Sequence, residues 1–544
     1  MKQHVIKTLK PVSYIFGALF SMSVVMGFQC EFFGNLLPHS WKSYFFFVLL
    51  FVIATLFSKL FWDMIKEKKS NAAPAFDSGD SKKPDKKAWP FYTAFIWICH
   101  FVMFLGVYPG FFVYDAFEEL NETITRSFSD QHPLFHVLSM GAIIQGAHKL
   151  TGNYNISVAI FILLQMSVNA VILGYVVSRA QKSGAKKQMC VILSLYFGLF
   201  PVLVMCDLCS SKDCIFTGIL VLLTIYLKDC FNYDQSSIPV SLYIKIALAT
   251  LIMMLYRNNG VYAIILFMAV YVLWALISHA GIKKGFVYTI LGTAAVYVLI
   301  NAALIGLTGA ERIGHREILT VPIMQLSRVY AYDREDMPAE DISKLESYIP
   351  KENLMQYTPK CSDMVKIGFD EQAFLSDKTG FLKLWIKTGL DHPVAYLDAF
   401  CMTSYGMWYS NATLDGYKGR EVFTFTYDKS SYFGYETEPP GNRISFIPVI
   451  DGFYRYLSIE GGEKAIPIAS LVFSPGFMLW MYLFGLGYFL YTGQVKRTIA
   501  YIPALATGLT CFLGPMSLLR YAFYLWILVP VLFWDMLKKP TTLI

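Results

Sequence analysis

Charged residues are scarce in this chain. Only 16% of its 544 residues are Asp, Glu, Lys or Arg, whereas soluble domains carry about 25%. Hydrophobic residues make up 55% and include 44 Phe and 35 Tyr, a composition typical of lipid-facing and interfacial surfaces. The net charge of +7 is small for this length and is concentrated in a few short loops, which argues against nucleic-acid binding. The composition predicts an all-α polytopic membrane protein.

Several common motifs are also missing. The sequence contains no dinucleotide fingerprint, no P-loop and no zincin motif. Three of the ten cysteines, Cys206, Cys209 and Cys214, fall close together, but no second ligand pair accompanies them, so the spacing predicts no metal there. A disulfide in this loop, or between Cys361 and Cys401, stays open. The N-terminal apolar run lacks a small-residue cleavage site, which favours a retained first span over a signal peptide.

Apolar runs long enough to cross a bilayer recur along the chain. We expect about 12 spans, near residues 11–30, 43–62, 91–109, 155–179, 188–206, 214–228, 240–256, 261–279, 286–306, 466–491, 498–513 and 520–538. If the N-terminus is cytoplasmic, strict alternation places every strongly basic loop on the cytoplasmic side, as the positive-inside rule requires. The C-terminus is then cytoplasmic as well.

This pattern divides the chain into five parts. They are two N-terminal spans (1–62), a basic, disordered cytoplasmic linker (63–89), a transmembrane core (90–306) with an external loop (110–153), an extracellular, mainly helical mixed domain (307–465), and the C-terminal spans (466–544). In the external domain we expect helices over 317–332, 339–348 and 370–389, and loop or short strands over 409–447.

The stretch from Tyr108 to His136 carries the densest set of titratable groups beside a span. Asp115, Glu118 and Glu119 fall within about one helical turn. A carboxylate at the water–lipid boundary is partly desolvated, which raises its pKa and makes it a better base. Asp115 is nearest to the preceding span and is the candidate catalytic base. The alternative is an acidic helix N-terminus stabilised by the helix dipole.

Two histidines follow in the same stretch. Pro133 suits the first position of a short helix, and His132 and His136, four residues apart, then share one face of that helix. They could bind a metal, or hold a phosphate or an acceptor by hydrogen bonds. The alternative is that His132 marks the helix entry and His136 packs under the loop.

Three isolated cations lie at span ends on the predicted outer face: Lys212, Arg257 and Arg520. A basic residue there opposes the topology rule, so its presence indicates another role. The phosphate of a lipid carrier would supply one, because guanidinium groups match phosphate oxygens. The alternative is snorkelling or pairing with a nearby acid, such as Lys212 with Asp207 or Asp213.

Taken in order, these motifs resemble those of the bacterial multi-span GT-C glycosyltransferases, over residues 90–540. The matching elements are Tyr108-Pro109-Gly110, Tyr114-Asp115, His132-Pro133-Leu134-Phe135-His136, Ser211-Lys212-Asp213, Arg257-Asn258-Asn259-Gly260 and Arg520-Tyr521, with the segments from Pro322 to Arg328 and from Tyr357 to Asp363 between the last two. The spans at 11–30 and 43–62 and the linker 63–89 precede the matching region and carry no such motif.

The resemblance implies a GT-C-like transmembrane core with an external domain before the last three spans. It implies transfer of a hexose or pentose from a polyprenyl-phosphate-linked sugar donor to an envelope glycan acceptor on the extracytoplasmic face. Asp115 would be the general base, Glu118, Glu119, His132 and His136 would support it, and Lys212, Arg257 and Arg520 would bind the donor phosphate. A divalent metal could assist, although no metal ligand set is predicted. A lipid-linked glycan transporter or flippase and a membrane O-acyltransferase are the alternatives.

Overall fold

Helices are the only regular secondary structure over the residues that the structure describes. The computed structural model describes residues 11–38, 40–71, 88–112, 115–234, 237–312, 315–415, 444–458 and 462–538. Within these ranges β-pairing is limited to isolated bridges. The all-α prediction is confirmed for the described part of the chain.

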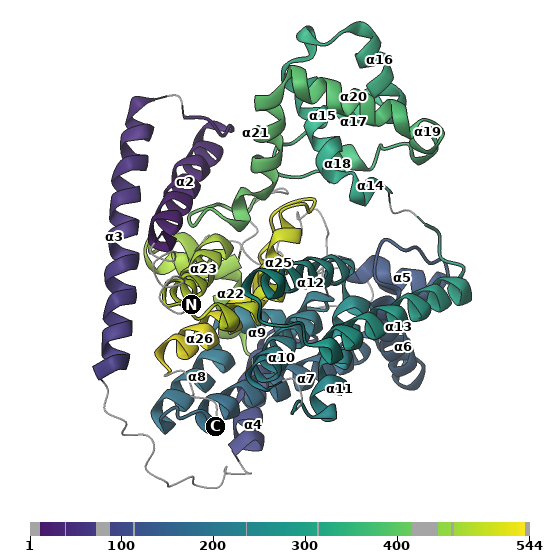
Figure 1. Cartoon of the computed structure of the whole chain (residues 1–544). Helices are drawn as coiled ribbons and strands as arrows, with labels where there is room; N and C mark the ends of the chain where they lie inside the picture. The colour runs from purple at the N-terminus through teal and green to yellow at the C-terminus, as the bar shows by residue number, and fades with distance from the viewer. Residues whose placement is uncertain are drawn as a thin grey trace.

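Three groups of helices can be followed in Figure 1. The first is an N-terminal hairpin of α2 (Val12–Phe33) and α3 (Trp41–Asn71). The second is a central bundle that contains α4 (Ala88–Gly106), α5 (Ala116–Thr125), α6 (Leu134–Thr151), α7 (Tyr154–Lys182), α8 (Lys187–Leu199), α9 (Pro201–Leu208), α10 (Asp213–Asn232), α11 (Val240–Tyr256), α12 (Asn258–Ser278), α13 (Lys284–Thr308), α22 (Pro448–Ser458), η3 (Gly462–Lys464), η4 (Ala469–Phe473), α23 (Pro475–Tyr491), α24 (Val495–Ile499), α25 (Ile502–Cys511), η5 (Leu519–Ala522) and α26 (Phe523–Leu537).

The third group is a separate helical domain at one end of the bundle (Figure 1). We call residues 315–404 the extramembrane domain. It contains α14 (His315–Ile318), α15 (Thr320–Tyr332), η1 (Arg334–Asp336), α16 (Ala339–Tyr348), α17 (Lys351–Leu354), α18 (Asp363–Lys366), α19 (Glu371–Ser376), α20 (Lys378–Asp391) and α21 (Pro393–Ser404), and η2 (Tyr405–Met407) leads back to the bundle. The domain has its own core, in which Leu326, Leu345 and Phe381 are fully buried.

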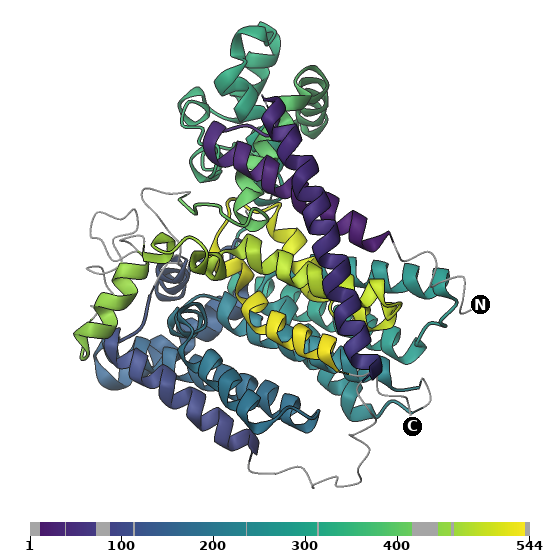
Figure 2. The same cartoon turned by 90° about the vertical axis from the view of Figure 1, so that its left-hand side faces the viewer.

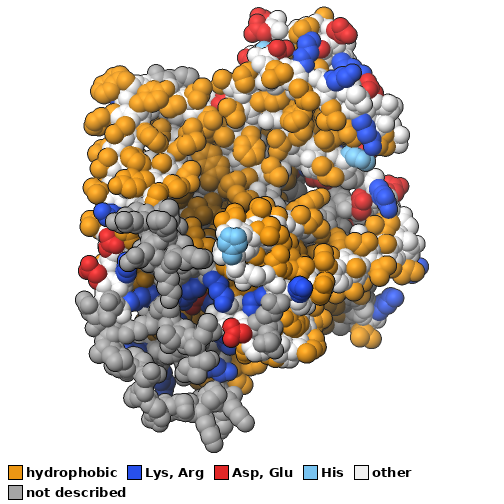
Figure 3. Space-filling model, in the orientation of Figure 1, with side chains coloured by type: hydrophobic (Ala, Val, Ile, Leu, Met, Phe, Trp, Pro, Cys, Tyr) orange, Lys and Arg blue, Asp and Glu red, His pale blue; other side chains and the backbone are white. Residues whose placement is uncertain are grey.

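The protein is a multi-pass membrane protein. Eight described helices are long and apolar enough to cross a bilayer, and the bent pair of α8 and α9 makes up to nine. The spans predicted at 240–256, 466–491 and 498–513 fold as the shorter helices α11, α23 and α25. Figure 3 shows hydrophobic side chains over most of one face of the hairpin and bundle, with Lys and Arg concentrated near the lower end and on the extramembrane domain.

The hairpin packs against the C-terminal helices, as Figure 2 shows. Trp62 is fully buried there, with its ring 5.2 Å from that of Phe484 and 5.3 Å from that of Tyr491. Because α3 continues to Asn71, the predicted linker 63–89 begins inside a helix, and its residues 72–87 lie outside the described residues. The loop or strands predicted over 409–447 fall mostly outside them too, since 416–443 are not described.

Arg328 and Asp398 of the extramembrane domain form a buried ion pair, and both side chains also hydrogen-bond to the backbone of the hairpin turn. The Arg328 guanidinium lies 3.2 Å from Asp398 Oδ2 and donates to the Gly34 carbonyl at 3.0 Å. The other carboxylate oxygen of Asp398 accepts from the Leu36 amide at 2.6 Å. The two spans that precede the matching motifs are therefore connected to the domain above the bundle.

Candidate active site

The predicted site residues meet at the end of the bundle that faces the extramembrane domain. A short backbone pairing sets their positions: the Phe111 amide donates to the Leu208 carbonyl at 2.8 Å, and the Ser210 amide donates to the Phe111 carbonyl at 2.9 Å. This pairing holds the turn before α5 against the loop between α9 and α10. It thereby brings Asp115 and Lys212 together, although 97 residues separate them in the chain.

Asp115 directly precedes α5, but its side chain does not cap that helix. Its Oδ2 atom accepts from Lys212 Nζ at 2.6 Å and from the Arg520 guanidinium at 3.4 Å. Lys212 also donates to Glu119 Oε1 at 3.1 Å. The Glu119 side chain is only 2% exposed, against 26% for Asp115. The acidic turn is thus the carboxylate side of an ion network rather than a solvated helix face.

Glu118 is peripheral to this network. Its side chain is 70% exposed, and its nearest network contact is 3.7 Å, from Oε2 to His132 Nε2. Of the three acids predicted for the turn, Asp115 and Glu119 point into the site.

The charges of the site reverse the predicted pKa shift of Asp115. Burial is the largest influence and on its own raises the pKa of the carboxyl, but Lys212, Arg520 and His132 together lower it well below its ordinary value. The pKa of Glu119 is also lowered, because Lys212 and His136 outweigh its burial. Burial lowers the pKa of Lys212, yet the two carboxylates raise it overall. The expectation that burial makes Asp115 a stronger base is therefore wrong for the site as it stands.

One of the two histidines lies on the predicted helix and the other does not. Pro133 precedes the first residue of α6, so His132 lies just outside the helix and only His136 is on it. Both still face Glu119: His136 Nε2 is 3.1 Å from Oε2, and His132 Nδ1 is 3.7 Å from Oε1. The aromatic ring of Tyr256 packs against His136, with 5.6 Å between the ring centroids.

Asp115, Glu119 and His132 each direct one ligand atom to a common point, and these atoms lie within 4.8 Å of one another. A metal ion could bind there by geometry. The Lys212 ammonium, however, lies 2.6, 3.1 and 3.1 Å from Asp115, Glu119 and His132, respectively. It holds the position that such an ion would need.

The other two predicted cations belong to the same network. Arg257 forms an ion pair with Asp213. The Arg520 side chain bridges Asp213 and Asp115: its Nε atom is 3.6 Å from Asp213 Oδ2, and a terminal nitrogen is 3.4 Å from Asp115 Oδ2. Burial lowers the pKa of Arg257, but Asp213 raises it overall. Lys212 does not pair with Asp207 or Asp213, because Asp207 binds His100 instead, with 2.8 Å between Oδ2 and Nδ1.

Sequence reasoning missed two contributors to the site. Tyr521 lies beneath both guanidinium groups, with its ring centroid 4.7 Å from Arg257 and 5.2 Å from Arg520; the Arg-Tyr motif contained it without indicating this role. Lys366, on the extramembrane domain, is 9% exposed and pairs with Glu317 at 2.7 Å. Its pKa is raised despite burial, by Asp363 and Glu317 and by the nearby Tyr521. No local pattern predicts its burial, which comes from the packing of the domain.

The extramembrane domain is joined to the site by one backbone and one side-chain hydrogen bond. The Ser362 amide donates to the Pro515 carbonyl at 3.0 Å, close to the segment that carries Arg520. The Arg316 guanidinium donates to Gln131 Oε1 at 3.1 Å, next to His132. The domain therefore contacts the segments that carry the basic and the histidine parts of the network.

The network is balanced in charge, which limits its chemistry. Lys212, Arg257 and Arg520 are matched by Asp115, Glu119 and Asp213. An anion such as a phosphate can bind these cations only by replacing carboxylate contacts. A carboxylate of this network that loses such a contact also loses the charge that lowers its pKa.

Comparison with known proteins gives one match. None of the curated proteins and none of the solved structures that were compared matches the chain. A model described as "Family of unknown function (DUF6020)" matches residues 120–542, which include every predicted site residue except Asp115, Glu118 and Glu119. The chain therefore belongs to DUF6020, a family of unknown function.

Proposed function

We propose that the protein is a GT-C type glycosyltransferase. It transfers a sugar from a polyprenyl-phosphate donor to an envelope glycan acceptor on the extracytoplasmic side of the membrane. The observation that carries the proposal is the contact of Asp115 with Lys212 and Arg520 in one largely buried network. This is the pairing of a base with phosphate ligands that such a transfer requires.

In the proposed reaction, the acceptor hydroxyl attacks the anomeric carbon of the donor sugar. Its proton passes to Asp115 as the new glycosidic C–O bond forms. The bond between the anomeric carbon and the phosphate oxygen breaks, and polyprenyl phosphate leaves with the electron pair. Lys212, Arg257 and Arg520 offset the charge on this leaving group, which is often the largest catalytic contribution. A single displacement inverts the anomeric carbon.

Donor binding would also activate the base. In this network Lys212 and Arg520, together with His132, keep the pKa of Asp115 well below its ordinary value, so the carboxylate is a weak base. A donor phosphate that draws Lys212 and Arg520 toward itself removes this stabilisation, while the burial that raises the pKa remains. Asp115 then becomes a stronger base only when the donor is present, which protects against wasteful proton transfer.

The contacts of Lys212 also favour this ammonium group, rather than a metal ion, as the positive charge beside Asp115 and Glu119. A divalent ion among Asp115, Glu119 and His132 would have to displace the ammonium from three contacts of 2.6 to 3.1 Å. We therefore assign donor-phosphate stabilisation to the chain's own cations.

The proposal also includes the topology: 12 spans, cytoplasmic termini and an extramembrane domain on the outer side of the membrane.

The test is transfer from a labelled polyprenyl-phosphate sugar by the purified full chain in proteoliposomes, with envelope polymer, lipid-linked glycan or protein offered as acceptor. Asp115→Asn removes the base and is expected to lower the rate at least about 100-fold, within the usual contribution of a positioned base. Glu118→Gln, on the exposed edge of the same turn, is the matched control and should keep the wild-type rate. An Asp115→Asn variant as active as wild type would reject the assignment.

Two further arms separate the alternatives. Movement of the labelled lipid across the bilayer without any acceptor would indicate a flippase. Transfer from a labelled acyl donor, but not from the sugar donor, would indicate an O-acyltransferase that uses His132 or His136.

A further inference from the structure

A second polar cluster lies inside the bundle, outside the network just described. It is formed by His100 on α4, Asn169 on α7, Cys206 and Asp207 on α9, and Cys214 at the start of α10; all five are buried. Asp207 Oδ2 is 2.8 Å from His100 Nδ1, and its Oδ1 atom accepts from Asn169 Nδ2 at 2.7 Å. The Cys214 thiol donates to the same Oδ1 atom at 3.5 Å. Ionisable groups inside membrane helices are costly and usually mark a functional site.

The cluster has more hydrogen-bond acceptors than donors. Asn169 Oδ1 is buried, and so is Oε1 of Gln165, the residue one turn earlier on α7; neither accepts a hydrogen bond from any described residue. The Asp207 carboxylate and two sulfur atoms add further electron-pair donors. Buried acceptors without partners are rare in folded proteins. A surplus of this kind is the environment in which a bound cation is stabilised.

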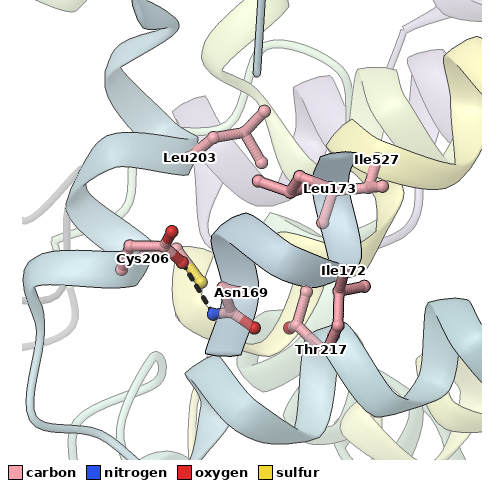
Figure 4. A pocket seen from close by; sticks show the side chains of 9 residues that line it. Asn169, Ile172, Leu173, Leu203, Cys206, Thr217 and Ile527 are labelled. Carbon is pink, nitrogen blue, oxygen red and sulfur yellow. Dashed lines mark hydrogen bonds between the residues drawn. The ribbon is translucent and has the colours of Figure 1, made fainter. Parts of the chain in front are cut away.

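A small cavity opens beside these groups, as Figure 4 shows. It is lined by Asn169, Cys206, Asp207, Thr217 and Gly218 together with apolar side chains, and its volume of about 10 Å³ is enough for one small ion or one water. A Cβ atom at Gly218 would lie 2.5 Å from Asn169 Oδ1, so the glycine leaves room for this amide beside the cavity.

We propose that Cys206, Asp207 and Cys214 bind one thiophilic metal ion, with Zn²⁺ as the ion that best fits the donor set. Their ligand atoms lie within 4.8 Å of one another. Ligands around one tetrahedral zinc are about 3.5–3.8 Å apart, given Zn–S bonds of about 2.3 Å and Zn–O bonds of about 2.0 Å, so the side chains need to contract by only about 1 Å. The carboxylate favours zinc over copper(I), which prefers purely soft ligands.

Charge and protons balance on binding. The ion displaces the S–H protons of Cys206 and Cys214, which leave to solvent, and the two thiolates and Asp207 then surround the dication. His100 holds the second oxygen of Asp207, as partners of ligating carboxylates commonly do. The cavity leaves the fourth position to a water or to the amide oxygen of Asn169. The cysteine spacing alone predicted no metal, because Asp207 and the cavity emerge only from the packing of α7, α9 and α10.

The experiment is metal analysis of the full chain, purified in detergent without a histidine tag or chelator and then incubated with Zn²⁺. Wild type is expected to retain about one zinc per chain after desalting, as structural zinc sites do. Cys206→Ser and Cys214→Ser should each retain less than about a tenth of that. Cys230→Ser, at a buried cysteine near the other end of α10, is the matched control and should retain the wild-type amount. Co²⁺ substitution should give the absorption bands of tetrahedral thiolate coordination in wild type and in Cys230→Ser only.

Because the readout is bound metal rather than sugar transfer, the result is independent of the proposed function. Size-exclusion profiles and tryptophan fluorescence establish that each variant is folded. Three results would overturn the proposal: a wild type that retains no zinc, Cys206→Ser and Cys214→Ser variants that retain as much as the control, or a disulfide between Cys206 and Cys214 found by mass spectrometry of the alkylated protein.

Discussion

Replacing Lys212 with methionine should change both the stability of the protein and the direction of its pH dependence. The ammonium lies 2.6 Å from Asp115 and 3.1 Å from Glu119. At an effective dielectric constant of about 20, an ion pair at such a distance gains roughly 5 kcal/mol, and desolvation offsets much of it. Removing one member of a buried pair typically costs about 3–5 kcal/mol, because the remaining charge stays buried. We expect a loss of this size at pH 7.

The pH dependence gives a sharper test than the size of the loss. In wild type the pKa values of Asp115 and Glu119 are lowered on folding. Their contribution to stability is therefore present above their unfolded pKa values near 4 and is lost as the pH falls through the folded values. Lys212 is the largest of the influences that lower these pKa values, so without it we expect burial to outweigh the remaining charges and to raise the folded pKa values. The Lys212→Met variant should then become more stable as the pH is lowered from 7 to 5, over which range the wild-type carboxylates contribute no change.

The assay is the thermal unfolding midpoint in detergent, followed by tryptophan fluorescence at pH 5, 6 and 7. The double variant Lys212→Met/Glu119→Gln serves as the control for charge: it removes one of the stranded carboxylates and should recover at least about 1 kcal/mol of the loss at pH 7. A Lys212→Met variant as stable as wild type at pH 7, or one that responds to pH as wild type does, would refute the network as described.

Three other substitutions test separate parts of the structure. Arg257→Lys keeps the charge but loses the planar group stacked on Tyr521, so transfer should fall roughly tenfold with folding unchanged; a wild-type rate would contradict this contact. Asp398→Ala leaves Arg328 buried without its carboxylate partner and should speed proteolysis between the hairpin and the extramembrane domain. An unchanged cleavage pattern would contradict the proposed role of Asp398 in joining the domain to the hairpin turn. Gly27→Val places a Cβ atom 2.3 Å from the Tyr409 ring and should lower the free energy of unfolding by roughly 1–3 kcal/mol, seen as a lower thermal midpoint, whereas Gly292→Ala, which meets no atom within 4 Å, should leave the midpoint unchanged.

Local pattern was sufficient for much of the secondary structure. The helix predicted over 339–348 is α16, with the same bounds, and the helix predicted over 370–389 is found as α19 and α20. Each of these depends on periodicity within a few turns, which the sequence displays directly. The break between α19 and α20 was not predicted; it occurs at Asp377, whose side chain caps the second helix by accepting from the Gly380 amide. A single cap within a periodic pattern is hard to distinguish from a continuous helix.

The ion-pair partners of the site residues could not be predicted from local pattern in the same way. Sequence proximity suggested that Lys212 pairs with Asp207 or Asp213, because both lie within a few residues of it. In the folded chain each of these acids has another partner far from it in sequence: His100 on α4 for Asp207, and Arg257 between α11 and α12 for Asp213. Lys212 is left to the carboxylates of the α5 turn, which the pairing of Phe111 with the 208–210 segment brings within reach. Tertiary packing between segments about 100 residues apart determines which acid pairs with Lys212, and residue spacing in the sequence does not predict it.

The pKa of Asp115 shows why this matters for function. From the sequence, burial at a span end was the only influence that could be counted, and it predicts a raised pKa and a competent base. The fold adds Lys212 and Arg520 to the same carboxylate and reverses the sign. The three cations identified from topology are thus already paired with carboxylates in the folded chain. They are held by Asp115 and its neighbours. In the proposed mechanism a donor phosphate would therefore compete with Asp115 for them, and that competition would link donor binding to the activation of the base.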